Sequence, residues 1–461
     1  MKIEVEEHRR LLKRYDRSGP RYTSYPTALH FHEGFDHVSY EARLAEANRQ
    51  GADKPWSVYL HLPFCQKRCL FCACNVIISP RKQAVVSYLD EIAREIDLVA
   101  AHIPNRRRIS QLHLGGGTPT YFAPDELGRL LDHLLERFEL EPGAEASVEV
   151  DPRVTTVEHL EVLVARGFNR VSLGVQDFDA DVQEAVGRQQ PLEQTRSLVE
   201  ACRRLELESI NFDLIYGLPH QTPQSFARTL ELALEMAPTR LAIYGFAYVP
   251  WMKGHQKKLN NGALPQRDAR FELLATARAT LAQAGYVDIG MDHFALPEDE
   301  LAVAQRQGRL WRNFMGYTVC KAPDMLGFGI SAIGDVQGAF VQNVRKLSTY
   351  RKALAEGRLP VERGYALNED DKLRQSVIRE LMCHGRIDKA QIEQIFDIDF
   401  DHTFANELKA LQKDAQAGLV TLKRQKVEAT ELGRLFVRNL AMPFDRHLNV
   451  AQGAERYSRT V

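Results

Sequence analysis

"SVYLHLPF", residues 57–64, indicates the fold because polar and apolar residues alternate along it. Val58 and Leu60 lie on one face of the strand that this pattern predicts. Tyr59 and His61 lie on the opposite face. A parallel strand that is covered on both faces has an almost continuous run of apolar residues instead. The alternation therefore predicts a strand that packs against helices on one face and borders a polar space on the other.

The same plan of a strand, a turn and an amphipathic helix recurs between residues 57 and 250. In the helical pattern at residues 83–101, the apolar residues Val85, Leu89 and Ile92 recur at steps of three and four. The alternation of strands and helices along the chain predicts parallel strands joined by right-handed crossovers. The five further candidate strands are "ISQLHLGGG" (109–117), "EASVEVDP" (145–152), "RVSLGVQ" (170–176), "SINFDLIYG" (209–217) and "RLAIYGFAYVP" (240–250).

Polar residues on the second face of these strands favour an open barrel over a closed one. The third strand presents Glu149 and Asp151 on this face, and the fifth presents Asp213. A closed eight-stranded barrel fills its interior with Val, Ile and Leu. We therefore predict an α/β fold, an open (β/α)6 partial TIM barrel, with its site at the carboxyl ends of the strands. A doubly wound open sheet is the alternative.

The pattern changes outside the barrel. "YVDIGMDHFALP", residues 286–297, predicts one more strand, with Asp292 and His293 near its end. Helical patterns and then a hairpin and a helix within residues 418–440 predict a mainly α-helical, winged-helix-like C-terminal domain. A lid or packing role and a nucleic-acid role are the alternatives for that domain. The predicted regions are an N-terminal substrate-covering segment (1–50), the barrel (51–300), a connecting extension (301–365) and the C-terminal domain (366–461).

Composition and charge argue against several classes of protein. Lys and Arg number 60 and Asp and Glu 61 among 461 residues, so no long-range field attracts nucleic acid or an anionic membrane. No apolar run approaches the ~20 residues of a membrane span, and the charged N-terminus has no apolar signal segment. Seven unevenly spaced cysteines make a poor disulfide framework. We therefore expect a cytoplasmic protein that neither crosses a membrane nor binds nucleic acid. We also expect it to be a monomer.

The loop "FCQKRCLFCACN", residues 64–75, holds four of the seven cysteines directly after the first predicted strand. Cys65, Cys69 and Cys72 have the spacing Cys-x3-Cys-x2-Cys, with which three thiolates can hold one iron–sulfur cluster and leave one iron open. A zinc site with four cysteine ligands is the alternative, although Cys72 and Cys74 form a cramped pair for tetrahedral coordination. In the cluster interpretation Cys74 is surplus. It is then either a reactive thiol near the substrate or a small buried residue.

This spacing after the first strand of such a barrel resembles that of the radical S-adenosylmethionine superfamily. The resemblance implies a [4Fe-4S] cluster held by Cys65, Cys69 and Cys72, with S-adenosylmethionine chelated to the open iron. Reductive cleavage of that cofactor gives methionine and a 5′-deoxyadenosyl radical, which abstracts hydrogen from an unactivated carbon. The implied electron donor is a protein of the flavodoxin or ferredoxin type.

Further stretches resemble one branch of that superfamily, the oxygen-independent coproporphyrinogen III oxidases (dehydrogenases), over almost the whole chain. This resemblance implies oxidative decarboxylation of two propionates of coproporphyrinogen III to vinyls, which gives protoporphyrinogen IX in haem biosynthesis. The stretches are "GPRYTSYPTA" (19–28), "HLPFCQKRCLFCACN" (61–75), "HLGGGTPT" (113–120), "EVDPR" (149–153), "GVQDF" (174–178), "DLIYGLP" (213–219) and "GMDHFA" (290–295).

A haem chaperone of the same superfamily, which binds and transfers haem without oxidase activity, is the alternative function. In the chaperone an aromatic residue typically follows the cluster loop, where this chain has Cys74. The segment "RYTSYPTA", residues 21–28, is also missing from the chaperone. Both features favour the enzyme.

The resemblance also assigns site residues. It gives Cys74 and Tyr59 catalytic roles. In "RNFMGY", residues 312–317, Met315 stands where a Gln that contacts a second S-adenosylmethionine is expected, so we expect one or two molecules of this cofactor. The residues assigned to S-adenosylmethionine are Tyr59, Phe71, Gly116, Gly117, Thr118, Glu149, Gln176, Arg188, Asp213, Ala247, Phe314 and Ile333.

The N-terminal stretch "HRRLLKRYDRSGPRYTSY", residues 8–25, is rich in cations. The implied substrate carries four carboxylates, which require positive partners. We expect this stretch to fold over the barrel mouth and to keep the reaction away from water. A solvent-exposed tail is the alternative.

Overall fold

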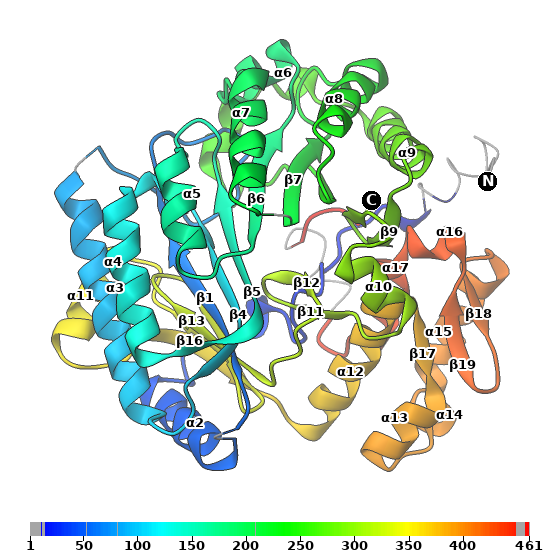
Figure 1. Cartoon of the computed structure of the whole chain (residues 1–461). Helices are drawn as coiled ribbons and strands as arrows, with labels where there is room; N and C mark the ends of the chain where they lie inside the picture. The colour runs from blue at the N-terminus through cyan, green and yellow to red at the C-terminus, as the bar shows by residue number, and fades with distance from the viewer. Residues whose placement is uncertain are drawn as a thin grey trace.

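The structure is a computed structural model that describes residues 11, 14–51, 53–80, 82–207, 209–448 and 457–460. In Figure 1 a curved sheet carries helices on its outer face. The C-terminal domain, drawn in orange and red, lies beside that sheet.

Six parallel strands form the centre of one twelve-stranded sheet, as the alternation predicts. Each strand pairs with the next strand of the repeat, whereas a doubly wound sheet reverses its strand order midway. The open partial barrel is therefore confirmed, and the doubly wound alternative is wrong. The six strands are β1 (Trp56–Leu62), β4 (Arg108–Gly116), β5 (Glu139–Val150), β6 (Arg170–Gln176), β7 (Ser209–Tyr216) and β8 (Arg240–Gly245).

A seventh parallel strand, β13 (Asp324–Phe328), pairs with β1 on the side away from β4. The sequence did not predict it, because five residues are too few to show a period. Antiparallel strands extend the sheet beyond β13 and beyond β8, and the outermost strands of the two ends do not pair, so the sheet stays open. The added strands are β14 (Ile333–Val336), β15 (Ala339–Asn343) and β16 (Val361–Ala366) at one end, and β10 (His293–Ala295) and β9 (Val287–Gly290) at the other.

The single strand predicted at residues 286–297 is wrong, because this segment forms the antiparallel hairpin of β9 and β10. Gly290 and Met291 adopt positive φ angles of 142° and 47°, which reverse the chain. Asp292 and His293 therefore lie at the turn, and His293 pairs with β8. Two shorter ladders pair β2 (Phe64–Cys65) with β3 (Ile77–Ile78) and β11 (Trp311–Asn313) with β12 (Gly316–Thr318).

Amphipathic helices pack on the apolar face of the sheet and form the main core with it. In α3 (Lys82–His102), Ile92 and Ile96 are fully buried, which confirms the predicted apolar stripe. Burial of each such side chain contributes roughly 1.5–3 kcal/mol. The other α-helices before residue 366 are α2 (His37–Gln50), α4 (Pro124–Arg137), α5 (Val157–Val164), α6 (Ala180–Val186), α7 (Leu192–Arg204), α8 (Pro223–Glu235), α9 (Arg267–Gln283), α10 (Glu300–Arg306) and α11 (Leu347–Ala355).

The C-terminal domain has a second core of buried residues. Its three-stranded sheet has the order β17-β19-β18, so the predicted hairpin and the helices around it are confirmed. The boundaries drawn between the four predicted regions remain predictions. The elements of this domain are α12 (Glu369–His384), β17 (Arg386–Asp388), α13 (Lys389–Phe396), α14 (Phe400–Thr403), α15 (Ala405–Gln416), β18 (Val420–Leu422), β19 (Lys426–Ala429), α16 (Glu431–Arg434) and α17 (Val437–Ala441).

The described part of the N-terminal segment packs against the C-terminal domain. Tyr22 and Tyr25 are buried in the second core. Arg438 of α17, itself buried, donates hydrogen bonds to the carbonyl oxygens of Gly19 and Pro20. Residues 1–10, 12 and 13, which carry much of the predicted cationic stretch, lie outside the described residues.

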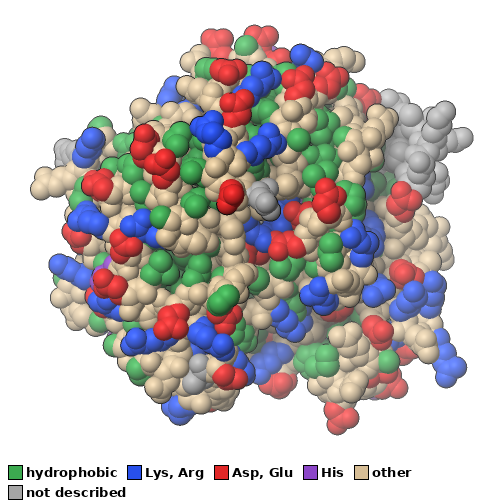
Figure 2. All heavy atoms as spheres, viewed as in Figure 1, with side chains coloured by type: hydrophobic (Ala, Val, Ile, Leu, Met, Phe, Trp, Pro, Cys, Tyr) green, Lys and Arg blue, Asp and Glu red, His purple; other side chains and the backbone are tan. Residues whose placement is uncertain are grey.

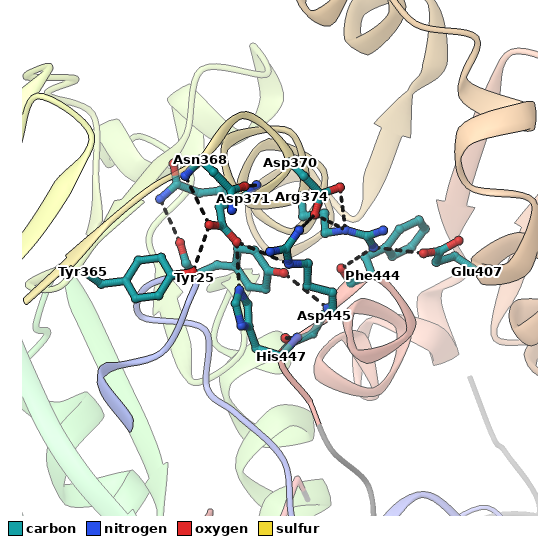
Figure 3. A network of polar contacts seen from close by, with 12 residues as sticks. Tyr25, Tyr365, Asn368, Asp370, Asp371, Arg374, Glu407, Phe444, Asp445 and His447 are labelled. Atoms are coloured by element: carbon teal, nitrogen blue, oxygen red, sulfur yellow. Dashed lines mark hydrogen bonds and ion pairs between the residues drawn. The ribbon is translucent and has the colours of Figure 1, made fainter. Parts of the chain in front are cut away.

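A polar network around Asp371 of α12 joins several of these segments (Figure 3). Asp371 is fully buried and accepts hydrogen bonds from the Tyr365 hydroxyl at 3.0 Å and the Asn368 N–H at 3.2 Å. Nε2 of His447 lies 2.8 Å from the same carboxylate. The hydroxyl of Tyr25 accepts a hydrogen bond at 3.2 Å from the backbone N–H of Arg446. The network therefore fixes the start of α12 against both ends of the chain.

The surface charges and the cysteines of the structure agree with what the composition predicts. Cations and anions are mixed over the face drawn in Figure 2. All seven cysteines are free thiols. Within the described ranges, no helix has the length and apolar character needed to cross a bilayer.

Candidate active site

The cysteine loop begins at the carboxyl end of β1, where the ladder of β2 with β3 holds its base. Its four cysteines line a cavity of about 330 Å³, here named the cysteine cavity, together with residues at the ends of β4 to β7. Barrels of parallel strands carry their functional residues at this edge. The predicted site residues that line the cavity are Cys65, Cys69, Phe71, Cys72, Cys74, Gly116, Gly117, Thr118, Glu149, Gln176, Arg188 and Asp213.

Two arginines direct N–H groups at the sulfur of Cys69. Nη2 of Arg153 lies 3.8 Å and Nη1 of Arg188 lies 3.7 Å from that sulfur. Oδ2 of Asp151 holds both guanidinium groups, at 2.7 Å and 2.9 Å. Two cations therefore border the sulfur of one predicted cluster ligand. Nε of Arg188 is buried without a hydrogen-bond partner among the described residues, so it can still bind a ligand.

The thiols of the loop differ in pKa because their surroundings differ. A hydrogen bond from Cys74 lowers the pKa of Cys72 to about 6, and the same contact raises the pKa of Cys74. Burial raises the pKa of Cys65 to about 11. The loop therefore places thiols of very different acidity in one cavity.

The glycine turn at the end of β4 packs tightly on β1. The N–H of Gly117 donates to the carbonyl oxygen of Leu62 at 2.9 Å, and a Cβ on Gly117 would lie 2.5 Å from the carbonyl carbon of Pro63. At Gly116 φ is 111°, and a Cβ would lie 2.5 Å from Nδ1 of His61. This packing requires glycine even without a ligand. The assignment of both glycines to S-adenosylmethionine stays a prediction.

Glu149 presents a carboxylate to the cysteine cavity. Its Oε2 accepts a hydrogen bond from the Gly116 N–H at 3.2 Å, and its Oε1 lies 3.5 Å from Nε2 of His113. Burial alone raises the pKa of Glu149, but these contacts hold it below its ordinary value. Because the side chain faces the cavity, 46% of its surface is still accessible. It is therefore an ionised acceptor that a cationic ligand can reach.

Asp213 lies on the same polar face, on β7. It accepts hydrogen bonds from Ser172 at 3.0 Å and from Asn211 at 2.9 Å. Burial and the neighbouring negative charge of Glu149 raise its pKa to about 7 despite these bonds. Two carboxylates that repel one another favour a positive group between them.

A second cavity, here named the lateral cavity, has a volume of about 290 Å³ and adjoins the cysteine cavity. Tyr59, Phe314 and Ile333 line it, and so does Met315. The Tyr59 hydroxyl lies 3.0 Å from Nδ1 of His61. The residues that line both cavities are Cys74, Gly116 and Glu149.

One predicted residue lies outside both cavities, and some lining residues were missed. The carbonyl oxygen of Ala247 accepts a hydrogen bond at 3.1 Å from Gln256, which also donates to the carbonyl oxygen of Phe71 at 3.1 Å. Gln256 therefore links Ala247 to the cysteine loop, and the assignment of Ala247 to the cofactor stays a prediction. The predicted site residues do not include Asp151 or Arg153, although Asp151 was placed on the polar face and both belong to the quoted stretch "EVDPR".

Comparison with known proteins gives first the class and then the family. The Radical SAM superfamily matches residues 59–233, and the HemN C-terminal domain matches residues 367–436. Fold and site together therefore define a radical S-adenosylmethionine protein.

Relatives that match over nearly the full length are more specific. The oxygen-independent coproporphyrinogen III oxidase of Pseudomonas aeruginosa is 43% identical over 453 residues, 98% of each chain. The protein of the same name from Escherichia coli K12 is 43% identical over 451 residues, again 98% of each. The solved structure of coproporphyrinogen III oxidase (HemN) from Escherichia coli, a radical SAM enzyme, has a TM-score of 0.89 at 43% identity, covering 93% of this chain and 98% of that one. The chain belongs to the oxygen-independent coproporphyrinogen III oxidase family.

Membership in the superfamily implies a [4Fe-4S] cluster and S-adenosylmethionine, and the residues present fit both. Three thiols of one loop face one cavity, beside two cations. The unpartnered Nε of Arg188 and the carboxylate of Glu149 suit the two charges of an amino acid.

Proposed function

We propose that this chain oxidises coproporphyrinogen III without oxygen, converting two propionates to vinyls and giving protoporphyrinogen IX. Its family relatives carry the name of that activity. The observation that carries the proposal is the continuity of two cavities, which share Cys74, Gly116 and Glu149. A cofactor in the cysteine cavity and a substrate arm in the lateral cavity would be in contact there.

The chain's own residues hold the cofactors in this proposal. Cys65, Cys69 and Cys72 ligate the cluster, and the guanidinium groups of Arg153 and Arg188 compensate its negative charge. When bound, the cluster and S-adenosylmethionine supply one-electron chemistry that removes hydrogen from an unactivated carbon. Each of the two reacting propionates then loses one hydrogen atom, carbon dioxide and one electron. An external acceptor takes the electron.

Polar residues of the cysteine cavity orient the S-adenosylmethionine. Glu149 and Asp213 accept hydrogen bonds from its ammonium or ribose hydroxyl groups, and Arg188 binds its carboxylate. Gly116, Gly117 and Thr118 bound the same space. The other proposed contacts are Tyr59, Phe71, Gln176 and Ala247.

The lateral cavity holds the catalytic candidates Cys74 and Tyr59. With one S-adenosylmethionine bound, Phe314 and Ile333 border the substrate arm in this cavity. A second S-adenosylmethionine would take the same space, where Met315 offers no side-chain hydrogen bond of the kind a Gln would give. Whether one or two molecules bind is decided by equilibrium dialysis of the cluster-loaded protein.

The N-terminal segment is proposed as a cover over the site. Arg21 forms an ion pair with Asp292, and Arg312 donates hydrogen bonds to the carbonyl oxygens of Arg21 and Tyr22 at 2.9 Å and 2.6 Å. Deletion of residues 1–30 should lower turnover, and undiminished turnover would contradict the covering role. A flavodoxin- or ferredoxin-type donor, a monomeric state and a cytoplasmic location complete the proposal.

The proposal is tested by anaerobic incubation of the cluster-loaded protein with dithionite, S-adenosylmethionine and coproporphyrinogen III. We expect protoporphyrinogen IX and the release of carbon dioxide. Stoichiometric binding of haem without formation of protoporphyrinogen IX would show instead the haem chaperone of the same superfamily.

A further inference from the structure

A third cavity, here named the cation cavity, has a volume of about 360 Å³ and opens from the lateral cavity. Phe314 and Met325 line both. Its walls come from the N-terminal segment, the hairpin of β11 with β12, the start of β13 and one face of α12. The proposed reaction assigns no group to this space.

Three cations line the cation cavity without a carboxylate partner. Arg312, Lys321 and Arg379 form no ion pair with any carboxylate in the described part of the chain. The guanidinium of Arg379 stacks 3.9 Å above the ring of Trp311, and the ammonium of Lys321 lies 4.6 Å from the same ring. Trp311 therefore holds two cations in place without neutralising either of them.

Individual N–H groups of these cations are also free. Nε of Arg312 and Nε of Arg379 are both buried without a hydrogen-bond partner among the described residues. A buried unpaired donor costs about 1–3 kcal/mol elsewhere in proteins, so such groups usually meet a ligand or water. The fixed fork of an arginine matches a carboxylate.

The acidic residues of the cavity do not neutralise the three cations. Asp324 forms an ion pair with Arg106 at 2.5 Å and accepts hydrogen bonds from Gln337 at 2.7 Å and 3.1 Å. Asp335 lines the same cavity, and burial raises its pKa to about 7, so it carries less than a full negative charge near neutral pH. A further lining cation, Lys372, is paired with Glu369 at 2.7 Å. The unpaired charge that faces the cavity is therefore positive.

We propose that the cation cavity binds the carboxylate arms of the tetracarboxylate substrate that are not decarboxylated, through Arg312, Lys321 and Arg379. This inference rests on the proposed function. The substrate has four propionates, and the reaction removes the carboxylates of two of them. The two carboxylates that are kept need positive partners while the other propionates react. The cavity adjoins the lateral cavity at Phe314, so arms bound there leave another arm directed towards Cys74. The three residues are thus specificity-determining residues.

This assignment adds cations that the sequence-based prediction did not name. The prediction drew cations from the N-terminal stretch and stays a prediction; one residue of that stretch, Arg21, is paired with Asp292. The cation cavity adds the unpaired cations of the β11–β12 hairpin region and of α12. Arg379 lies far from Arg312 and Lys321 in the sequence, and so no local pattern joins the three.

The test compares substrate affinity with cofactor affinity in the cluster-loaded enzyme. The variants are Lys321→Gln, Arg379→Gln and the charge-conserving Lys321→Arg, and the control is Lys352→Gln at an exposed site on α11. We expect each removed charge to raise the KM for coproporphyrinogen III and the Kd for coproporphyrin III by about tenfold. Lys321→Arg and the control should stay within about twofold of the unaltered enzyme, and the Kd for S-adenosylmethionine should not change.

A chemical probe removes the charge from the ligand instead. Coproporphyrin III tetramethyl ester should bind the unaltered enzyme and the Gln variants equally weakly, because it has no anionic arms. Equal affinity of unaltered enzyme and Gln variants for the free acid, with turnover intact, would overturn the inference and leave the proposed function standing. Absence of turnover by the unaltered enzyme would overturn the proposed function and, with it, this inference.

Discussion

Two cysteines of the loop, two positions apart in the sequence, differ in their acidity and in their proposed roles. Cys72 and Cys74 are hydrogen-bonded neighbours, yet their pKa values move in opposite directions. One serves as a proposed ligand and the other lines both the cysteine and lateral cavities. Of the four cysteines of the loop, Cys74 alone lines both cavities and is therefore placed to meet both the cofactor and a substrate arm.

Substitution of individual cysteines separates these roles. Cys72→Ser should lose most of the iron and labile sulfide, because a cluster with two remaining thiolates is weakly held. Cys74→Ser should keep the iron and cleave S-adenosylmethionine but lose porphyrinogen turnover. Elemental analysis and separate assays of the two reactions check this, with Cys320→Ser as the control outside the loop. Loss of iron from Cys74→Ser would contradict the ligand assignment.

The raised pKa of Asp213 predicts a pH dependence of stability in the cofactor-free protein. Between 3.8 and about 7 the carboxyl ionises in the unfolded chain and stays protonated in the folded one, so the stability present at low pH is lost as pH rises. Asp213→Asn removes this loss. Relative to the unaltered protein, the variant should gain up to about 4 kcal/mol between pH 4 and pH 8.

Urea unfolding at several pH values measures the difference, and Asp53→Asn in an exposed loop is the matched control. Other buried carboxyls, such as Glu95 with a pKa raised to about 7, affect both proteins equally and cancel. A difference that does not change with pH would show that Asp213 is ionised in the folded state.

At the scale of elements, the packing of the turn after β4 against the chain that leaves β1 requires glycine at position 117. A Cβ on Gly117 would meet backbone atoms of Pro63 and Phe64 at 2.5 to 2.7 Å, and backbone cannot move aside as a side chain can. Gly117→Ala should therefore shift the turn, lower the free energy of unfolding by about 1–3 kcal/mol and weaken S-adenosylmethionine binding.

Gly254→Ala is the matched control, since nothing lies within 4 Å of its would-be Cβ. Urea unfolding and equilibrium binding of S-adenosylmethionine measure both variants. Unchanged stability and affinity in Gly117→Ala would mean that the glycine turn is not held against β1.

The elements that could be predicted from the sequence are those in which a pattern of apolar residues repeats over many positions. The alternation around Val58 and Tyr59 predicted the parallel strands, and the apolar residues of α3 recur over about four turns. β13 was missed because its five residues are recognisable only through pairing with β1. The cysteine ligand candidates are likewise local, whereas Arg312 and Arg379 meet only through the folded chain. Tertiary contacts of this kind leave no pattern in the sequence.

At the scale of the whole molecule, both ends of the chain meet at Arg438. This buried side chain donates hydrogen bonds to the carbonyl oxygens of Gly19 and Pro20 and, at 2.9 Å, to that of Arg459. Burial lowers its pKa to about 9, so it is charged at neutral pH. Arg438 therefore links the N-terminal segment, the C-terminal domain and the C-terminal end of the chain.

Arg438→Met should release the N-terminal segment. We expect the free energy of unfolding to fall by about 2–4 kcal/mol, because three carbonyl oxygens lose their donor. The KM for coproporphyrinogen III should rise while the affinity for S-adenosylmethionine is retained. Urea unfolding and steady-state kinetics check this against Arg434→Met, whose side chain is on the surface. An unchanged KM would contradict the covering role of the segment.

The pairing of β1 with β13 also determines how long one edge of β1 stays unpaired while the chain is synthesised on the ribosome. Trp56 of β1 lies opposite Asp324 of β13, so one edge of β1 has no partner until residue 328 has emerged. At roughly 5–20 residues per second, that edge waits on the order of tens of seconds. A nascent strand with open hydrogen-bonding groups invites pairing with another chain. Successful production of this protein therefore depends on what shields that edge during translation.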